Sequence, residues 1–77
     1  MYNSADVAAR IKEQAAAQEV SVRQVLLSSG LNYNAMSAMR TSMPKADNLA
    51  KIADYLDCSV DYLLGRTNDP QSHKKEA

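Results

Sequence analysis

Residues 20–42, VSVRQVLLSSGLNYNAMSAMRTS, decide the fold because they carry the start and stop signals of two short helices. Ser21 predicts a helix N-cap, and the Gln three residues later completes a capping box. Gly30 predicts the end of that helix, since a left-handed residue is needed there and glycine adopts this conformation at little cost. Asn32 then caps a second helix at once. The segment is therefore predicted to form two helices joined by a tight turn, at about 22–29 and 33–40.

The flanking sequence predicts three further helices, at about 4–18, 46–57 and 60–64. The clearest apolar stripe lies in the second of these, where Leu49, Ile52 and Leu56 follow helical spacing. Ser59 is expected to cap the last helix, which Gly65 closes. These signals predict an all-α domain of five short helices.

One compact domain is expected over residues 1–65, followed by a flexible polar tail over 66–77. The tail has no apolar periodicity and contains a proline. On the first helix, Arg10, Lys12, Glu13 and Gln14 are expected to face outward. The core is expected to centre on Leu49, Ile52, Leu56 and Leu63, together with Ile11, Val25, Leu31 and Met36.

The composition limits the classes of protein. No segment is long and apolar enough to span a membrane, and the N-terminus lacks a signal-peptide profile, so a cytoplasmic protein is expected. The single cysteine, Cys58, excludes an internal disulfide. The single histidine, His73, has no cysteine or second histidine near it, so no metal site is expected. We find no catalytic residues and expect neither enzyme activity nor a cofactor.

The net charge is zero, but the charges are unevenly distributed. Residues 20–46 contain Arg23, Arg40 and Lys45 and no acidic residue, whereas the rest of the chain holds six basic and nine acidic residues. We therefore expect a mildly positive face on the 20–46 segment and a negative face elsewhere. This distribution permits binding to nucleic acid.

Two short helices hinged on a glycine-containing turn are typical of the helix-turn-helix motif, whose second helix enters the DNA major groove. The chain over about residues 7–66 resembles the Cro/repressor family (lambda-repressor-like, XRE) of helix-turn-helix domains. The strongest part is PKADNLAKIADYLDCSVDYLLGR, residues 44–66, with its Leu-x-x-Ile-Ala-x-x-Leu stripe and final Asp-Tyr-Leu-Leu-Gly helix. The resemblance implies a lambda-repressor-like fold and a sequence-specific DNA-binding transcriptional regulator.

Several positions depart from the family pattern. Val22 stands where a phosphate-contacting Gln is frequent, and Arg40 stands where a Glu is often found. Leu26 replaces a usual small residue, and Ser29 replaces a usual Leu. These departures cluster near the half of the domain that would face DNA.

The resemblance places the base-reading positions on Tyr33, Asn34, Ser37 and Ala38. An Asn can bond an adenine edge, and an Ala or an aromatic edge can touch a thymine methyl group. The alternative is that these residues form only a solvated polar face behind a capping Asn32. Contacts to the DNA backbone are expected from Arg23, Asn32, Arg40, Thr41, Ser42 and Lys45, with Arg40 the strongest of them.

The expected partner is double-stranded DNA bound by a homodimer on a palindromic site, because one short helix reads too few bases for specificity. Apolar residues near the C-terminal end are the expected dimer contact, namely Tyr55, Val60, Tyr62 and Leu64. A rival interpretation is a protein-interaction module on the same fold, such as an antitoxin-like or repressor-binding partner with weakened DNA contact. Zero net charge and the missing phosphate-contacting Gln favour that rival.

Overall fold

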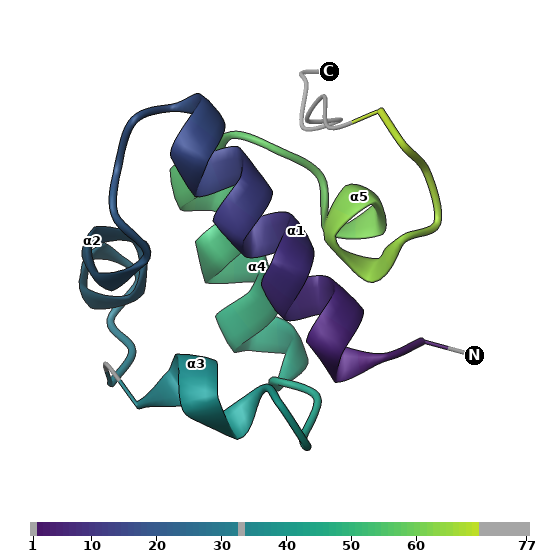
Figure 1. Cartoon of the computed structure of the whole chain (residues 1–77), viewed down its shortest axis with the longest axis horizontal. Helices are drawn as coiled ribbons and strands as arrows, with labels where there is room; N and C mark the ends of the chain where they lie inside the picture. The colour runs from purple at the N-terminus through teal and green to yellow at the C-terminus, as the bar shows by residue number, and fades with distance from the viewer. Residues whose placement is uncertain (1, 33, 70–77) are drawn as a thin grey trace.

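The computed structural model describes residues 2–32 and 34–69, which form five α-helices and, over that part of the chain, no strand (Figure 1). The helices are α1 (Ser4–Ala17), α2 (Val22–Ser28), α3 (Ala35–Ala38), α4 (Ala46–Leu56) and α5 (Val60–Leu64). For residues 2–32 and 34–69, the prediction of an all-α fold with five helices is thus confirmed. Its radius of gyration, 11.4 Å, is close to the value of about 11 Å expected for a compact chain of this size.

The two longest helices, α1 and α4, lie side by side in the middle of the molecule (Figure 1). Both are flanked by α2 on one side and by α5 on the other, as Figure 1 shows. The short α3 lies at the end of the molecule where α4 begins. The arrangement leaves α3 at the periphery of the bundle.

The core forms between the apolar stripes of α1, α2, α4 and α5. Six of the eight predicted core residues are buried, and the other two, Leu31 and Met36, are only partly buried at its edge. Two residues outside the predicted set are buried instead, namely Leu26 at 0% exposure and Met39 at 2% exposure. The bulky Leu26 is therefore a core residue. The fully buried large side chains are Val7, Ile11, Val25, Leu26, Met39, Ile52, Leu56 and Leu63.

Four of the five helices end in the same way, with a left-handed residue that closes a Schellman motif. Gly30 and Gly65 occupy this position after α2 and α5, at φ of 78° and 86°. After α1 and α4 the left-handed residues are Glu19 and Asp57, at φ of 60° and 54°. The characteristic backbone bonds are present in all four, for example Val20 N to Ala15 O at 2.9 Å and Leu31 N to Leu26 O at 2.9 Å. Glycine is therefore absent from two of the four positions that favour it.

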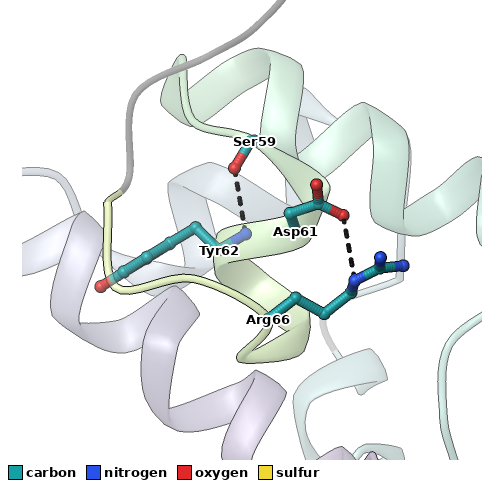
Figure 2. Close-up of polar contacts among 4 residues, drawn as sticks. All are labelled: Ser59, Asp61, Tyr62 and Arg66. Atoms are coloured by element: carbon teal, nitrogen blue, oxygen red, sulfur yellow. Dashed lines mark hydrogen bonds and ion pairs between the residues drawn. The ribbon is translucent and has the colours of Figure 1, made fainter.

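The predicted N-caps on either side of the core are confirmed. Ser21 Oγ accepts from the backbone N–H of Gln24 at 3.0 Å, and Ser59 Oγ accepts from that of Tyr62 at 3.0 Å (Figure 2). The reciprocal half of the predicted capping box is not formed. The Gln24 side chain donates instead to Ser28 Oγ, one turn further along α2.

The start of the predicted tail packs against α1. Arg10 is half-buried, and its guanidinium lies 4.5 Å from the centre of the Tyr62 ring. It donates to Thr67 O at 2.9 Å and to Asn68 Oδ1 at 2.8 Å. Arg66 also forms an ion pair with Asp61 at 3.7 Å, as Figure 2 shows. The outward orientation expected for Arg10 is wrong, because its flat cation stacks on an aromatic ring and binds the chain that follows α5. Residues 70–77 lie outside the described part.

Candidate nucleic-acid interface

The second helix of the predicted helix-turn-helix is shorter than expected. The predicted span of about 33–40 extends two residues beyond the helix at each end, since α3 covers Ala35–Ala38. After Ala38 the backbone forms turns, in which Arg40 N donates to Ser37 O at 3.1 Å and Thr41 N donates to Ala38 O at 3.2 Å. The segment from Asn32 to Lys45 is thus a one-turn helix between two folded loops.

Among the described residues of this segment, Met39 is the one buried side chain, and it anchors the segment to the core. Met39 is 2% exposed, whereas Ala35 and Met36 are only partly buried against the core. None of the four residues within α3 itself is buried. The position of α3 relative to the bundle therefore depends on the residue that follows its last turn.

The start of the segment is held by Asn32, as the sequence predicts, although the residue before α3 is Asn34. Asn32 Oδ1 accepts from the backbone N–H of Asn34 at 2.7 Å, and Asn32 O accepts from Ala35 N at 2.9 Å. The Asn34 side chain forms no capping bond. The Asn32 oxygen thus has a structural role, while the amide of Asn34 takes no part in the cap.

All the predicted contact residues that the structure describes are exposed, in agreement with a surface role. Tyr33 lies outside the described residues. The exposed residues from the predicted base-reading group are Asn34, Ser37 and Ala38, and those from the backbone-contacting group are Arg23, Asn32, Arg40, Thr41, Ser42 and Lys45.

Two hollows lie on either side of α3. The first, which we call the α2–α3 notch, has a volume of about 390 Å³ and is bordered by three separate elements. Asn34 and Ser37 come from the α3 segment, and the start of α2 supplies Arg23. The remaining lining residues are Lys12, Ser21, Val22 and Met36. The notch therefore joins two predicted base-reading residues to two basic side chains.

The second hollow, the α3–α4 hollow, is smaller and largely apolar. Its volume is about 220 Å³, and Lys45 is its one charged lining residue. Met43, at 40% exposure, is among the large apolar side chains most open to solvent in the described chain. The full lining is Leu31, Ala35, Ala38, Met39, Ser42, Met43, Pro44, Lys45 and Asn48.

Two other hollows, away from α3, have a different charge. One, between the start of α1 and the end of α5, has Arg10 on its wall together with Asp6 and Glu13. The other, between α2 and α4, has Lys51 together with Asp54. Each of these two linings thus contains at least one carboxylate, whereas the lining of the α2–α3 notch contains two basic residues and no acidic one.

Lys12 is the residue of this surface that sequence reasoning missed. Its spacing on α1 indicates only an outward-facing charge, and the side chain is indeed exposed. Its place beside Arg23 and Ser37 follows from the packing of α1 against α2. No local pattern in the sequence marks that proximity.

The residues of the expected dimer contact do not form one exposed surface in the structure. Tyr62 is only 6% exposed, and its hydroxyl donates to Glu13 at 3.2 Å, so its assignment to a free apolar surface is wrong. The ring is already used between α1 and α5. Tyr55 lines the hollow between α2 and α4, while Leu64 lines the one beside the start of α1.

The thiol of Cys58 is buried behind Ser59. Burial, with a further contribution from the neighbouring Asp57 charge, raises the pKa of Cys58 to about 11. Its thiolate is therefore scarce near neutral pH. Over residues 2–32 and 34–69, no three His, Cys, Asp or Glu side chains gather in a way that could hold a metal ion. No helix in that part of the chain has the length and apolar character to cross a membrane. His73 is not among the described residues.

Comparisons of the chain with protein-family models, with curated proteins and with solved structures gave no match.

Proposed function

We propose that this chain is a lambda-repressor-like helix-turn-helix domain that binds double-stranded DNA through α3 and acts as a sequence-specific transcriptional regulator in the cytoplasm. The observation that carries the proposal is the surface around α3. Its polar side chains are exposed, basic residues flank them on both sides, and residues 20–46 contain no carboxylate side chain to repel phosphate.

Direct readout is assigned to the exposed face of the α3 segment. The Asn34 amide has one donor and one acceptor group, which match the N7 and N6 positions of adenine. Ser37 can donate to or accept from a base edge, and the methyl group of Ala38 suits a thymine methyl. The Asn32 oxygen is used in the cap, so its NH₂ group is left to donate to a phosphate.

Contacts to the phosphates are assigned to the basic and hydroxyl side chains around this face. Arg40, Thr41, Ser42 and Lys45 follow α3 directly, and all four are exposed. Such contacts fix the register of a protein on the duplex without specifying sequence.

Two substitutions separate the two kinds of contact. Asn34→Ala should cost about 1–3 kcal/mol on the preferred site and relax the choice of base at one position. Arg40→Ala should weaken binding to all sequences alike and lower the salt dependence by about one unit of slope. Equal losses on preferred and random DNA for Asn34→Ala would remove that residue from the base-reading group.

Binding as a homodimer follows from the small size of this surface, because a monomer neutralises few phosphates and reads few bases. With Tyr62 buried, Tyr55, Val60 and Leu64 remain as the proposed contact residues, of which Tyr55 is the most open at 37% exposure. Sedimentation with operator-length DNA should give two chains per site. A single chain per site at saturation would contradict the dimer.

A second candidate function is a protein-interaction module, and the α3–α4 hollow favours it. An apolar depression beside the exposed Met43 is the kind of surface on which another protein can bury a side chain. The two candidate functions predict different affinities for DNA. A protein-interaction module should bind random and selected duplexes with the same affinity, whereas a sequence-specific regulator should bind the selected duplexes more tightly.

A further inference from the structure

We propose that the α2–α3 notch binds one backbone phosphate of the DNA, and that Lys12 of α1 is the residue that makes this contact together with Arg23. The inference rests on the DNA-binding function proposed above. It adds to the proposed surface a third element, α1, and a residue outside the predicted helix-turn-helix segment.

The chemistry of the lining favours an anion. Lys12 and Arg23 contribute two positive charges, and Ser21, Asn34 and Ser37 contribute groups that can donate hydrogen bonds. A phosphodiester has one negative charge and two free oxygens that only accept, so both kinds of group can act on it. Charge-assisted hydrogen bonds of this type are stronger than neutral ones.

The charge balance distinguishes this hollow from the other three described. The hollow at the start of α1 has two carboxylates, the lining of the α2–α4 hollow contains Lys51 and Asp54, and the α3–α4 hollow is largely apolar with one basic residue, Lys45. The lining of the notch contains two basic residues and no acidic one. An anion that enters it is therefore attracted without opposing repulsion from the walls.

The position of the notch favours DNA phosphate over a free anion. Asn34 and Ser37 lie on its wall and also belong to the proposed base-reading face. A phosphate held there thus lies beside the bases that α3 would read, and its position fixes the distance of α3 from the groove. Lys12 is accordingly a positioning residue that acts on the DNA backbone.

The notch also accounts for a departure from the family pattern. Val22, which replaces a polar residue, lines the notch and offers no hydrogen-bond donor in its side chain. Lys12 supplies a charge at the same hollow from a different helix. A phosphate contact is therefore retained although its usual side chain is missing.

The test measures binding to a mixed-sequence duplex of about 20 base pairs, long enough for two half-sites, as a function of salt concentration. Lys12→Gln should reduce the slope of log affinity against log salt by about 0.9 for each protein chain on the DNA. Referred to a 1 M salt standard, that slope corresponds to an affinity loss of about eightfold per chain at 0.1 M salt. Lys12→Arg, which keeps the charge, should retain the slope.

Lys51→Gln is the matched control, since Lys51 is also an exposed lysine on a helix but lines the hollow that contains Asp54. It should leave the slope unchanged. An unchanged slope in Lys12→Gln, or an equal reduction in both variants, would refute phosphate binding by Lys12 in the notch. DNA binding by the wild-type chain would not be affected by that result. Absence of salt-dependent binding by the wild-type chain would instead overturn the proposed function. Because Lys12 is exposed, its variants should keep the thermal midpoint of the parent chain.

Discussion

Replacement of Met39 by Ala should destabilise the domain far more than the same replacement of Met43. Met39 is 2% exposed and is the side chain that fixes the α3 segment to the core, whereas Met43 is 40% exposed at the edge of a hollow. Removing a buried methionine costs about 2–5 kcal/mol. For Met43 the loss should stay below about 1 kcal/mol, because much of its side chain already contacts water.

The loss at Met39 is a large part of the total stability, which for 77 residues is roughly 4–12 kcal/mol. Thermal unfolding followed by circular dichroism should show a midpoint lowered by at least about 8 °C in Met39→Ala. The Met43→Ala chain is the control, since both changes have the same chemistry and similar helix propensity. Equal, small shifts in the two variants would show that Met39 does not anchor α3.

Three further predictions concern stability. Glu19→Gly should raise the free energy of unfolding by about 1 kcal/mol in urea titrations, because the residue stands at φ 60° where glycine has no Cβ penalty; a loss of stability would contradict this. Ser59→Ala should cost about 0.5–2 kcal/mol by removing the bond to Tyr62 N, and an unchanged denaturation midpoint would show that the cap contributes nothing. The pKa of Cys58 is raised from 9.0 to about 11, so the folded state holds its proton longer and stability should fall as pH rises above 9, by up to about 1.4 kcal/mol per unit. Cys58→Ala should remove that part of the pH dependence, and the same slope in both chains would refute the assignment.

The helix ends could be predicted because their signals are local. Ser21 and Ser59 each bond a backbone N–H three residues away, and Gly30 adopts the left-handed conformation required within its own turn. These determinants depend on few neighbours and are visible in a single sequence. Glu19 and Asp57 show the limit, because they adopt the same conformation without the residue type that signals it.

The identity of the buried methionine could not be predicted in the same way. Met36 and Met39 both belong to the apolar side of the predicted helix, and the choice between them depends on how far the helix continues. Since α3 ends at Ala38, the chain turns and brings Met39 into the core while Met36 stays at its edge.

Contacts between distant residues were also beyond local patterns. Arg10 binds Thr67 and Asn68, which follow it by 57 and 58 positions in the sequence. Arg10 also stacks on the buried ring of Tyr62, a residue that the sequence prediction placed in an exposed dimer contact. The candidate DNA-contact surface contains residues that local sequence predicts and one that only the packing of distant helices reveals. The exposure of Asn34 and Arg40 agrees with the prediction from the segment, whereas the place of Lys12 depends on the packing of α1 against α2.

The most direct test of sequence-specific DNA binding is selection of bound fragments from a pool of random duplexes by the wild-type chain. The selection should enrich a palindromic consensus whose half-sites lie about one helical turn, roughly 34 Å, apart. Binding to all fragments alike, with no sequence enriched over the starting pool, would contradict it.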